Sequence, residues 1–292
     1  MNYVLMVLTV VISGAQSIFR KQFNLKNDGI TSAPYVFNFT ASLAALAFLA
    51  CFGFIGSGGF EHHLPTVGYA AGFGVLSSIA MLTVLYAFMY GSLSLTSLLL
   101  SYSTIMPVLY GIAFLGEAFT WKTGVGLALL VVSLYLFNIK KENFNITKKW
   151  LFFMIVLFLS NGTCAILMKV HQYHFPDQYQ LEFQGISYMI IALINAVILI
   201  GFAFSKMRGG MKKAFVSSTY LATPFGIANV GANLLTMVLA AVLPAVILFP
   251  VVSGGGIVTA YLIGRFLYKE KMSMVQNIAF LISIVSIVVL NL

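Results

Sequence analysis

Long apolar runs alternate with short polar gaps along the whole chain. A membrane-spanning helix needs about 20 consecutive apolar residues. Runs of this kind cover residues 3–22, 33–55, 67–90, 92–116, 120–139, 150–170, 183–205, 217–241, 243–268 and 273–291. They are too long for barrel strands and show no alternation of period two. The pattern predicts an all-α membrane protein with ten transmembrane helices, and the gaps leave no room for a soluble domain.

The composition supports this prediction and excludes other classes of protein. Of the 292 residues, 60% are hydrophobic and 8% are charged, whereas a soluble domain has about 25% charged residues. A net charge of +9 would favour nucleic acid in a soluble protein, but the basic residues lie almost entirely in the gaps between the apolar runs, when those at the ends of runs are counted with the nearest gap. Cys51 and Cys164 lie inside runs, so we expect no disulfide framework and no thiolate metal site. We therefore expect a lipid bilayer around the chain, no cofactor and no nucleic-acid partner.

The basic residues are divided unequally between the gaps. Fourteen of the 16 Lys and Arg residues belong to odd-numbered gaps, and only Lys122 and Lys169 belong to even-numbered ones. Short loops rich in Lys and Arg stay in the cytoplasm. The distribution predicts a multi-pass protein of the cytoplasmic membrane with both termini outside.

The two halves of the chain repeat one pattern. Glu117 and Glu270 are 153 positions apart, and the apolar runs after them align at the same offset. Thr120 and Ser273 match at the same offset of 153 positions. Near the start of each half the offset is 148 positions, which pairs Gly14 with Gly162 and Lys21 with Lys169. Because each half has five spans, an odd number, the second copy must be inverted in the membrane. We predict two inverted five-helix repeats, residues 1–139 and 150–292.

The fourth run and the gap after it carry the most specific motif. The segment SYSTIMP at 101–107 is followed by LGE at 115–117 and then by Trp121, Gly124 and Gly126. This pattern resembles the ten-helix EamA-type members of the drug/metabolite transporter superfamily. The resemblance implies a basket-like bundle of two inverted halves, a substrate cavity between them, and transport of small polar or amphipathic metabolites. It also implies cytoplasmic termini, opposite to the charge count.

Polar side chains in the middle of the runs are candidates for a substrate site, because a polar group in hydrocarbon needs a partner or water. Asn229 and Asn233 are four apart and share one helix face. They could bind a polar substrate or a neighbouring helix. Tyr102 lies among polar neighbours and could offer its ring to a cation or an aromatic substrate. The candidate substrate-binding residues are Gln16, Ser77, Ser101, Tyr102, Ser103, Asn161, Asn229, Asn233, Ser253 and Gly255.

Three consecutive glycines, 254–256, align with residues 101–103 at the offset of 153. Each glycine lowers helix propensity by about 1 kcal/mol relative to alanine. A break in the ninth span is one interpretation, because matched interruptions in both halves mark transporter sites. Close packing of helices at the glycines is the other.

The acidic residues all lie at the ends of runs or in gaps. A mechanism that needs a carboxylate at the membrane midplane, as in small multidrug exporters, is therefore not expected, and a neutral or zwitterionic substrate is favoured. Glu117 and Glu270 are expected to stabilise the starts of the helices that follow Thr120 and Ser273.

Lys21 and Lys169, at the ends of the first and sixth runs, are expected to extend to the membrane interface. Attraction of an anionic group is the alternative for this pair. His171, His174 and Asp177, with His62 and His63 in another even gap, could bind Zn²⁺. Their spacing alone is a weak signal, so we expect surface histidines and no metal site.

These patterns predict a secondary transporter, monomeric or homodimeric, that moves a small polar or zwitterionic metabolite such as an amino acid by alternating access. The cavity would be lined by the first, third, fourth, sixth, eighth and ninth spans. The alternatives are an intramembrane enzyme and an accessory membrane protein without transport activity. An enzyme would need paired carboxylates, a Ser/His dyad or metal ligands near the membrane face, and the sequence shows no such pattern.

Overall fold

The computed structural model describes residues 2–56, 63–90, 102–138, 147–204, 210–267 and 273–290. These residues form ten α-helices and no strand, which confirms the all-α prediction. The helices are α1 (Asn2–Lys26), α2 (Ala33–Gly56), α3 (Leu64–Tyr90), α5 (Ile105–Phe114), α6 (Trp121–Asn138), α7 (Lys148–His174), α8 (Gln180–Ala203), α9 (Met211–Val242), α10 (Ala245–Leu262) and α11 (Met274–Leu290). A π-helical turn, Ile263–Leu267, continues α10.

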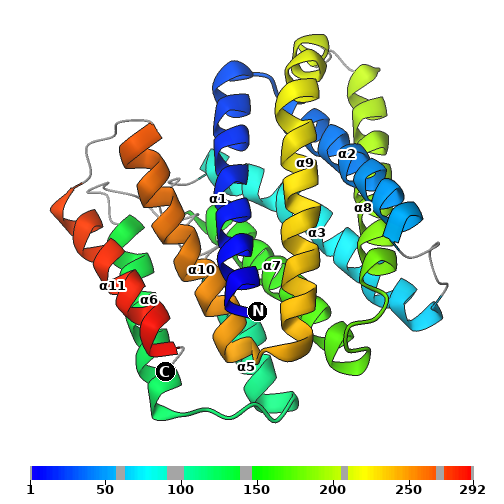
Figure 1. Cartoon of the computed structure of the whole chain (residues 1–292). Coiled ribbons are helices and arrows are strands. Elements are labelled where there is room, and N and C mark those ends of the chain that lie inside the picture. Colours follow the sequence, from blue (N-terminus) through cyan, green and yellow to red (C-terminus); the bar gives the residue numbers. More distant parts are fainter. Residues whose placement is uncertain are drawn as a thin grey trace.

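Six of these helices, α1, α2, α3, α7, α8 and α9, contain an apolar stretch long enough to cross a membrane. The others are shorter apolar helices. Both chain ends lie at the lower end of the bundle, as do the α5–α6, α7–α8 and α9–α10 connections (Figure 1). The α1–α2 connection, the end of α8 and the start of α9 lie at the opposite end. The described odd and even gaps are thus on opposite ends, and their orientation in the membrane stays a prediction.

Hydroxyl side chains define where two of the shorter helices begin. Thr120 Oγ1 accepts the backbone N–H of Thr123 at 3.2 Å before α6. Ser273 Oγ accepts the N–H of Gln276 at 3.2 Å, and Gln276 Oε1 accepts the N–H of Ser273 at 3.0 Å. The second arrangement is a capping box, which satisfies two otherwise unpaired donors at the start of α11. The predicted helix starts at Thr120 and Ser273 are confirmed.

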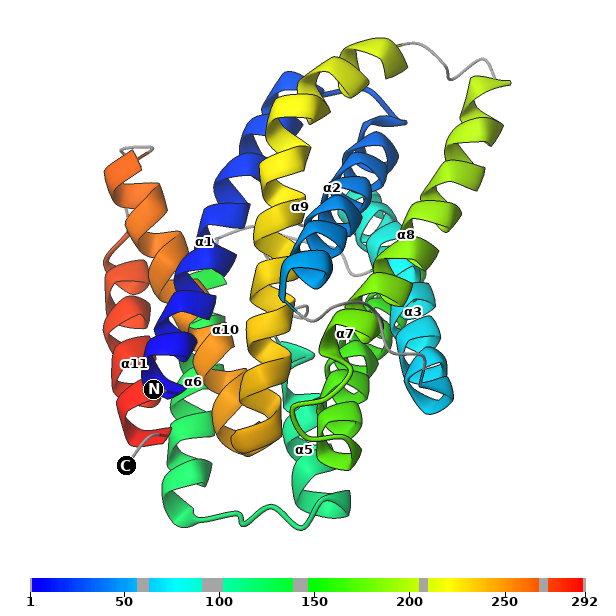
Figure 2. The same cartoon turned by 45° about the vertical axis from the view of Figure 1, so that its right-hand side comes forward.

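Helices of the two halves interleave in the bundle. From the first half, α3 packs on α7 and α8; from the second, α9 packs on α1 and α2. These contacts are the same pairings with the halves exchanged. The fifth helix of each half, α6 and α11, also pack together, and they stand side by side at one flank (Figure 2).

The α6–α11 contact shows the repeat at the level of single atoms. Ser133 Oγ of α6 donates to the carbonyl of Ala279 at 2.7 Å. Ser286 Oγ of α11 donates to the carbonyl of Gly126 at 2.8 Å. Both donors and both acceptors are separated by 153 positions. The two halves therefore make reciprocal hydrogen bonds, as a pseudo-two-fold relation requires.

A second pair of contacts confirms both repeat offsets. A Cβ atom on Gly14 of α1 would lie 2.6 Å from Thr259 Cβ of α10. A Cβ atom on Gly162 of α7 would lie 2.9 Å from Met106 Cβ of α5. Gly14 and Gly162 differ by 148 positions, and Met106 and Thr259 by 153. Small residues at matched positions let each pair of helices approach closely.

Glycine also sets the distance between α9 and α2. A side chain at Gly226 would overlap the backbone carbonyl of Ala41. In the matched contact between α3 and α8, a Cβ atom on Gly74 would lie 2.9 Å from the carbonyl oxygen of Ser187. Neither backbone can retreat without moving a whole helix, because both contacts lie inside the bundle.

Gly226→Ala is therefore expected to lower the free energy of unfolding by about 3 kcal/mol, at the upper end of what overpacking costs. Gly231→Ala in the same helix is the matched control, because a Cβ atom there meets nothing within 4 Å. Helix propensity alone should make the control neutral or more stable by up to about 1 kcal/mol. Thermal unfolding in detergent measures both, and equal stability of the two variants would contradict the close approach.

Of the two interpretations of the glycines in the ninth span, close packing agrees with the structure and a break of the helix does not. α10 is helical without interruption from Ala245 to Leu262. The glycines serve packing instead: a Cβ atom on Gly255 would lie 2.5 Å from Val10, and one on Gly254 would lie 3.2 Å from Ile287. In the first half a turn at residues 103–104 does precede α5. Within the described residues, the turn before α5 has no counterpart in α10. The glycines of α10 stay helical because side chains of neighbouring helices pack directly against them.

Candidate functional site

Four polar side chains from three helices form one hydrogen-bonded network. Asn229 of α9 donates from Nδ2 to Gln16 Oε1 of α1 at 2.9 Å. The hydroxyl of Tyr188 of α8 donates to Asn229 Oδ1. Asn233, one turn farther along α9, donates from Nδ2 to the same hydroxyl at 3.0 Å. The structure thus brings together Gln16, Asn229 and Asn233, and places both asparagines on one face of α9.

Tyr188 is the member of this network that the sequence did not reveal. Its side chain is 4% exposed, and its hydroxyl joins the two asparagines. The seventh span was not expected to line the cavity. One tyrosine in an apolar run gives no signal of a polar contact, so only the packing of α8 on α9 identifies it.

The amides of the network keep unused hydrogen-bonding groups. Gln16, Asn229 and Asn233 are all half-buried. Each carboxamide has two N–H donors and an oxygen with two lone pairs. Among the described residues, Asn229 and Asn233 each donate one N–H within the network, and Gln16 Nε2 donates to the carbonyl of Ala228 at 3.4 Å. The remaining donors and acceptors are of the kind that a small polar molecule can bind.

A cationic group lies one helical turn from the network. Arg20 follows Gln16 by four positions on α1, so the two share a helix face. Its guanidinium carbon lies 5.0 Å from the ring centroid of Phe225, which precedes Asn229 by one turn on α9. The sequence placed Arg20 in the first gap, whereas α1 continues to Lys26. Arg20 is therefore part of the span and its side chain is exposed.

Two more candidate pairs join α7 to the first half. Asn161 Nδ2 donates to Ser103 Oγ at 2.6 Å, beside the turn that precedes α5. Ser77 Oγ of α3 lies 3.4 Å from Cys164 Sγ. This second contact corresponds to the Asn229–Gln16 bond in the other half of the repeat. Ser77 matches Asn229 at an offset of 152, and Gln16 matches Cys164 at an offset of 148. Of the two matched contacts, the one between α1 and α9 is made by two amides, and the one between α3 and α7 is made by a hydroxyl and a thiol.

The remaining candidates do not join these clusters. The hydroxyl of Tyr102 donates to the carbonyl of Val131 in α6 at 3.0 Å. Gly255 packs against α1, and Ser253 is half-buried on α10. Ser101 lies outside the described residues.

The LGE segment folds back over the end of α5. Gly116 adopts a φ of +69°, a left-handed conformation that glycine accepts without strain. The N–H of Glu117 then donates to the carbonyl of Gly111 at 3.1 Å. A Cβ atom on Gly111 would lie 2.6 Å from Glu117 Oε2, so this glycine makes room for the carboxylate.

The carboxylate of Glu117 accepts hydrogen bonds at the start of α10, not of α6 as predicted. Oε1 accepts the N–H of Ala245 at 2.8 Å, and Oε2 accepts that of Val246 at 3.2 Å. A negative charge is favoured there by the exposed N–H groups and the dipole of the helix. Its role is structural, as expected, but α10 is distant in sequence and only the tertiary fold brings it to Glu117.

The prediction that Lys169 extends to the interface is wrong. The side chain is 8% exposed, and Nζ lies 3.3 Å from Glu117 Oε1. Nζ also donates to the carbonyls of Ala240 and Leu243, at 2.9 and 2.6 Å. A cation at the end of α9 and an anion at the start of α10 thus hold the turn between these helices. The side chain of Lys21 lies outside the description.

Two of the histidines, His63 and His171, are joined through the hydroxyl of Thr66. Thr66 Oγ1 lies 3.0 Å from His63 Nδ1 and 2.9 Å from His171 Nε2. His171 is fully buried, in contrast to the expected surface position. In the parts of the chain that the structure describes, no group of three His, Cys, Asp or Glu residues could hold a metal ion. His62 lies outside these parts.

Comparisons with known proteins agree with this architecture. Residues 1–139 match the model of the EamA-like transporter family. Among solved structures, a crystal structure of a protein superposes with a TM-score of 0.75 at 12% sequence identity, covering 100% of this chain and 98% of that chain. At this identity the likeness shows the fold alone. No curated protein sequence matches the chain.

Proposed function

Because residues 1–139 match the model of the EamA-like transporter family, a family of multi-pass membrane proteins, we propose that this chain is a secondary transporter of a small zwitterionic metabolite, such as an amino acid. Transport would proceed by alternating access, in which the two halves move around a central site. The proposal contains no catalytic step. It places the chain in the cytoplasmic membrane, with termini outside as the charge distribution favours.

One observation carries the proposal: the network of Gln16, Tyr188, Asn229 and Asn233 lies where α1 of the first half meets α8 and α9 of the second. A site between halves that move relative to each other can be opened to either side. Its amides and hydroxyl can bind the neutral polar groups of a substrate. In this proposal the hydrogen bond between Gln16 of the first half and Asn229 of the second breaks and forms as the two halves move relative to each other.

Arg20 supports the choice of a zwitterionic substrate. A guanidinium group pairs with a carboxylate through two parallel N–H···O bonds. In this proposal the substrate carboxylate binds Arg20, its amino group binds amide oxygens of the network, and Phe225 holds the guanidinium in place.

The test is counterflow in liposomes that contain the purified chain. We expect saturable exchange of an amino acid and at least about tenfold weaker exchange of the matching amino acid amide, because the amide lacks the charge that Arg20 binds. Arg20→Gln should reduce this preference while leaving the Tm within about 2 °C. Absence of exchange for amino acids, amines, nucleosides and sugars would contradict the transporter proposal. Exchange without preference for the carboxylate would contradict the role of Arg20 alone.

A further inference from the structure

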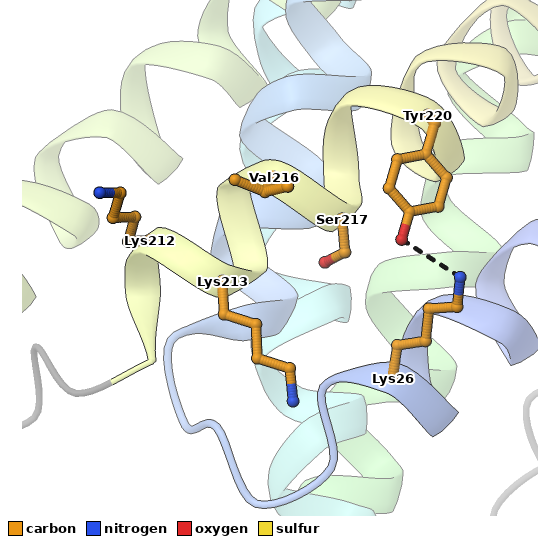
Figure 3. Close-up of a pocket in the computed structure, with 6 residues that line it drawn as sticks. All are labelled: Lys26, Lys212, Lys213, Val216, Ser217 and Tyr220. Atoms are coloured by element: carbon orange, nitrogen blue, oxygen red, sulfur yellow. Dashed lines mark hydrogen bonds between the residues drawn. The ribbon is translucent and has the colours of Figure 1, made fainter.

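A hollow of about 610 Å³ lies at the upper end of the bundle, where α1 ends and α9 begins. It is far along both helices from the amide network, so it is separate from the proposed transport site. Its lining consists of Lys26, Lys212, Lys213, Val216, Ser217 and Tyr220 (Figure 3). Half of these residues are lysines, although the chain as a whole is poor in charge.

Tyr220 holds one of the lysines in position. Lys26 Nζ lies 3.2 Å from the hydroxyl of Tyr220 and 4.8 Å from the centroid of its ring. The side chain of Lys213 points toward the same space from the first turn of α9, and Lys212 extends to the other side of that turn (Figure 3). Two ammonium groups from segments almost 190 positions apart in sequence thus flank Ser217.

The base of the hollow is rigid. Asn27 Nδ2 donates to Ser217 Oγ at 2.8 Å, and Ser217 Oγ lies 3.1 Å from Asn27 Oδ1. Asn27 is 4% exposed and Ser217 is 5% exposed. This buried pair fixes the distance between the end of α1 and the start of α9. The two lysines therefore project from helix ends that buried side chains join to each other.

The positive charge of the hollow is not compensated within the described part of the protein. No carboxylate there forms an ion pair with Lys26, Lys212 or Lys213, and the first turn of α9 contains no acidic residue. The N–H groups at the start of a helix add to the attraction for an anion. Like charges held close together repel each other, and a bound anion removes this cost.

We propose that this hollow binds a phosphate-bearing anion. The ends of the spans lie at the depth of lipid headgroups, and basic pockets between transmembrane helices bind anionic headgroups. A phosphate offers several acceptor oxygens that can face Lys26 and Lys213 together. The phosphate can come from an anionic phospholipid or from a soluble phosphate compound, and the two sources share this chemistry.

The experiment is a thermal-shift titration of the purified full chain in neutral detergent with three probes: short-chain phosphatidylglycerol, short-chain phosphatidylcholine and inorganic phosphate. Phosphatidylglycerol or inorganic phosphate should raise the Tm in a saturable way, whereas the zwitterionic phosphatidylcholine should not. The double variant Lys26→Gln/Lys213→Gln should weaken the Kd by about thirtyfold, and each single variant by about fivefold.

The matched control is Lys148→Gln/Lys149→Gln. It removes the same charge from the first turn of another long helix, α7, in an odd-numbered gap, and it should change the Kd less than twofold. Saturation by phosphatidylglycerol alone identifies a lipid site, and saturation by inorganic phosphate identifies a soluble ligand. Equal losses in the two double variants, or no saturable shift with either anion, would overturn the proposal. Each of these outcomes is independent of whether the chain transports amino acids.

Discussion

Glu117→Gln is expected to lower the free energy of unfolding by about 3–5 kcal/mol, the cost of breaking a buried ion pair on one side. Lys169 would remain buried without its counter-charge, since the two side chains are 8% and 10% exposed. The carboxylate charge at the start of α10 would be lost as well. Equilibrium unfolding of the purified protein in mixed micelles measures the difference.

The control for this prediction is Asp177→Asn at the same end of the bundle. Asp177 is exposed and its carboxylate accepts one hydrogen bond, from Gln180, so its loss should cost less than about 0.5 kcal/mol. Lys169→Met combined with Glu117→Gln should be less destabilising than the sum of the two single changes, because each single change leaves one buried charge unpaired and the double variant leaves none. Additive effects would show that the two side chains do not interact.

Asn229→Leu is expected to reduce amino-acid exchange by about ten- to one-hundredfold. The change removes the amide that connects Gln16 to Tyr188. Each polar group left without a partner costs about 1–3 kcal/mol, and 1.4 kcal/mol corresponds to a factor of ten. Tyr188→Phe should have a similar but smaller effect, because it removes only the hydroxyl that both asparagines contact. Initial rates of counterflow in liposomes measure both variants.

Asn195→Leu is the matched control. Asn195 also lies inside the bundle, on α8, but its Nδ2 donates to the carbonyl of Ile191 in the same helix. Its replacement should leave exchange within about twofold of the unchanged protein, because no hydrogen bond within the described residues joins it to the network. Normal exchange by Asn229→Leu, in protein that inserts and unfolds at the usual Tm, would assign the network to helix packing alone.

The local and repeating parts of the fold could be predicted from sequence because they depend on short-range chemistry. Apolar runs marked the helices, and the hydroxyls of Thr120 and Ser273 marked where two of them begin. The repeat was visible in Gly14 and Gly162 at an offset of 148 and in Glu117 and Glu270 at 153, and the offset of 153 recurs in the reciprocal bonds of Ser133 and Ser286. A duplicated and inverted sequence has to make matched contacts, so such offsets carry information about packing.

The partners of buried polar groups could not be predicted, because they depend on which helices meet. Glu117 and Lys169 appeared to be local end groups, yet they join at the turn between α9 and α10. Tyr188 gave no signal before α8 was placed against α9. The glycines of α10 lower helix propensity, but contacts with Val10 and Ile287 hold the helix intact, so tertiary packing overrides propensity.

The sequence by itself determined that this protein is an all-helical membrane bundle built from two inverted halves, because lipid admits only backbones that satisfy their own hydrogen bonds. The tertiary structure alone decided which polar side chains meet: the amides with Tyr188, Arg20 with Phe225, and Lys26 with Tyr220. Hydrophobicity is a property of each residue and its near neighbours, whereas a hydrogen bond or an ion pair between helices depends on the distance between segments far apart in the chain.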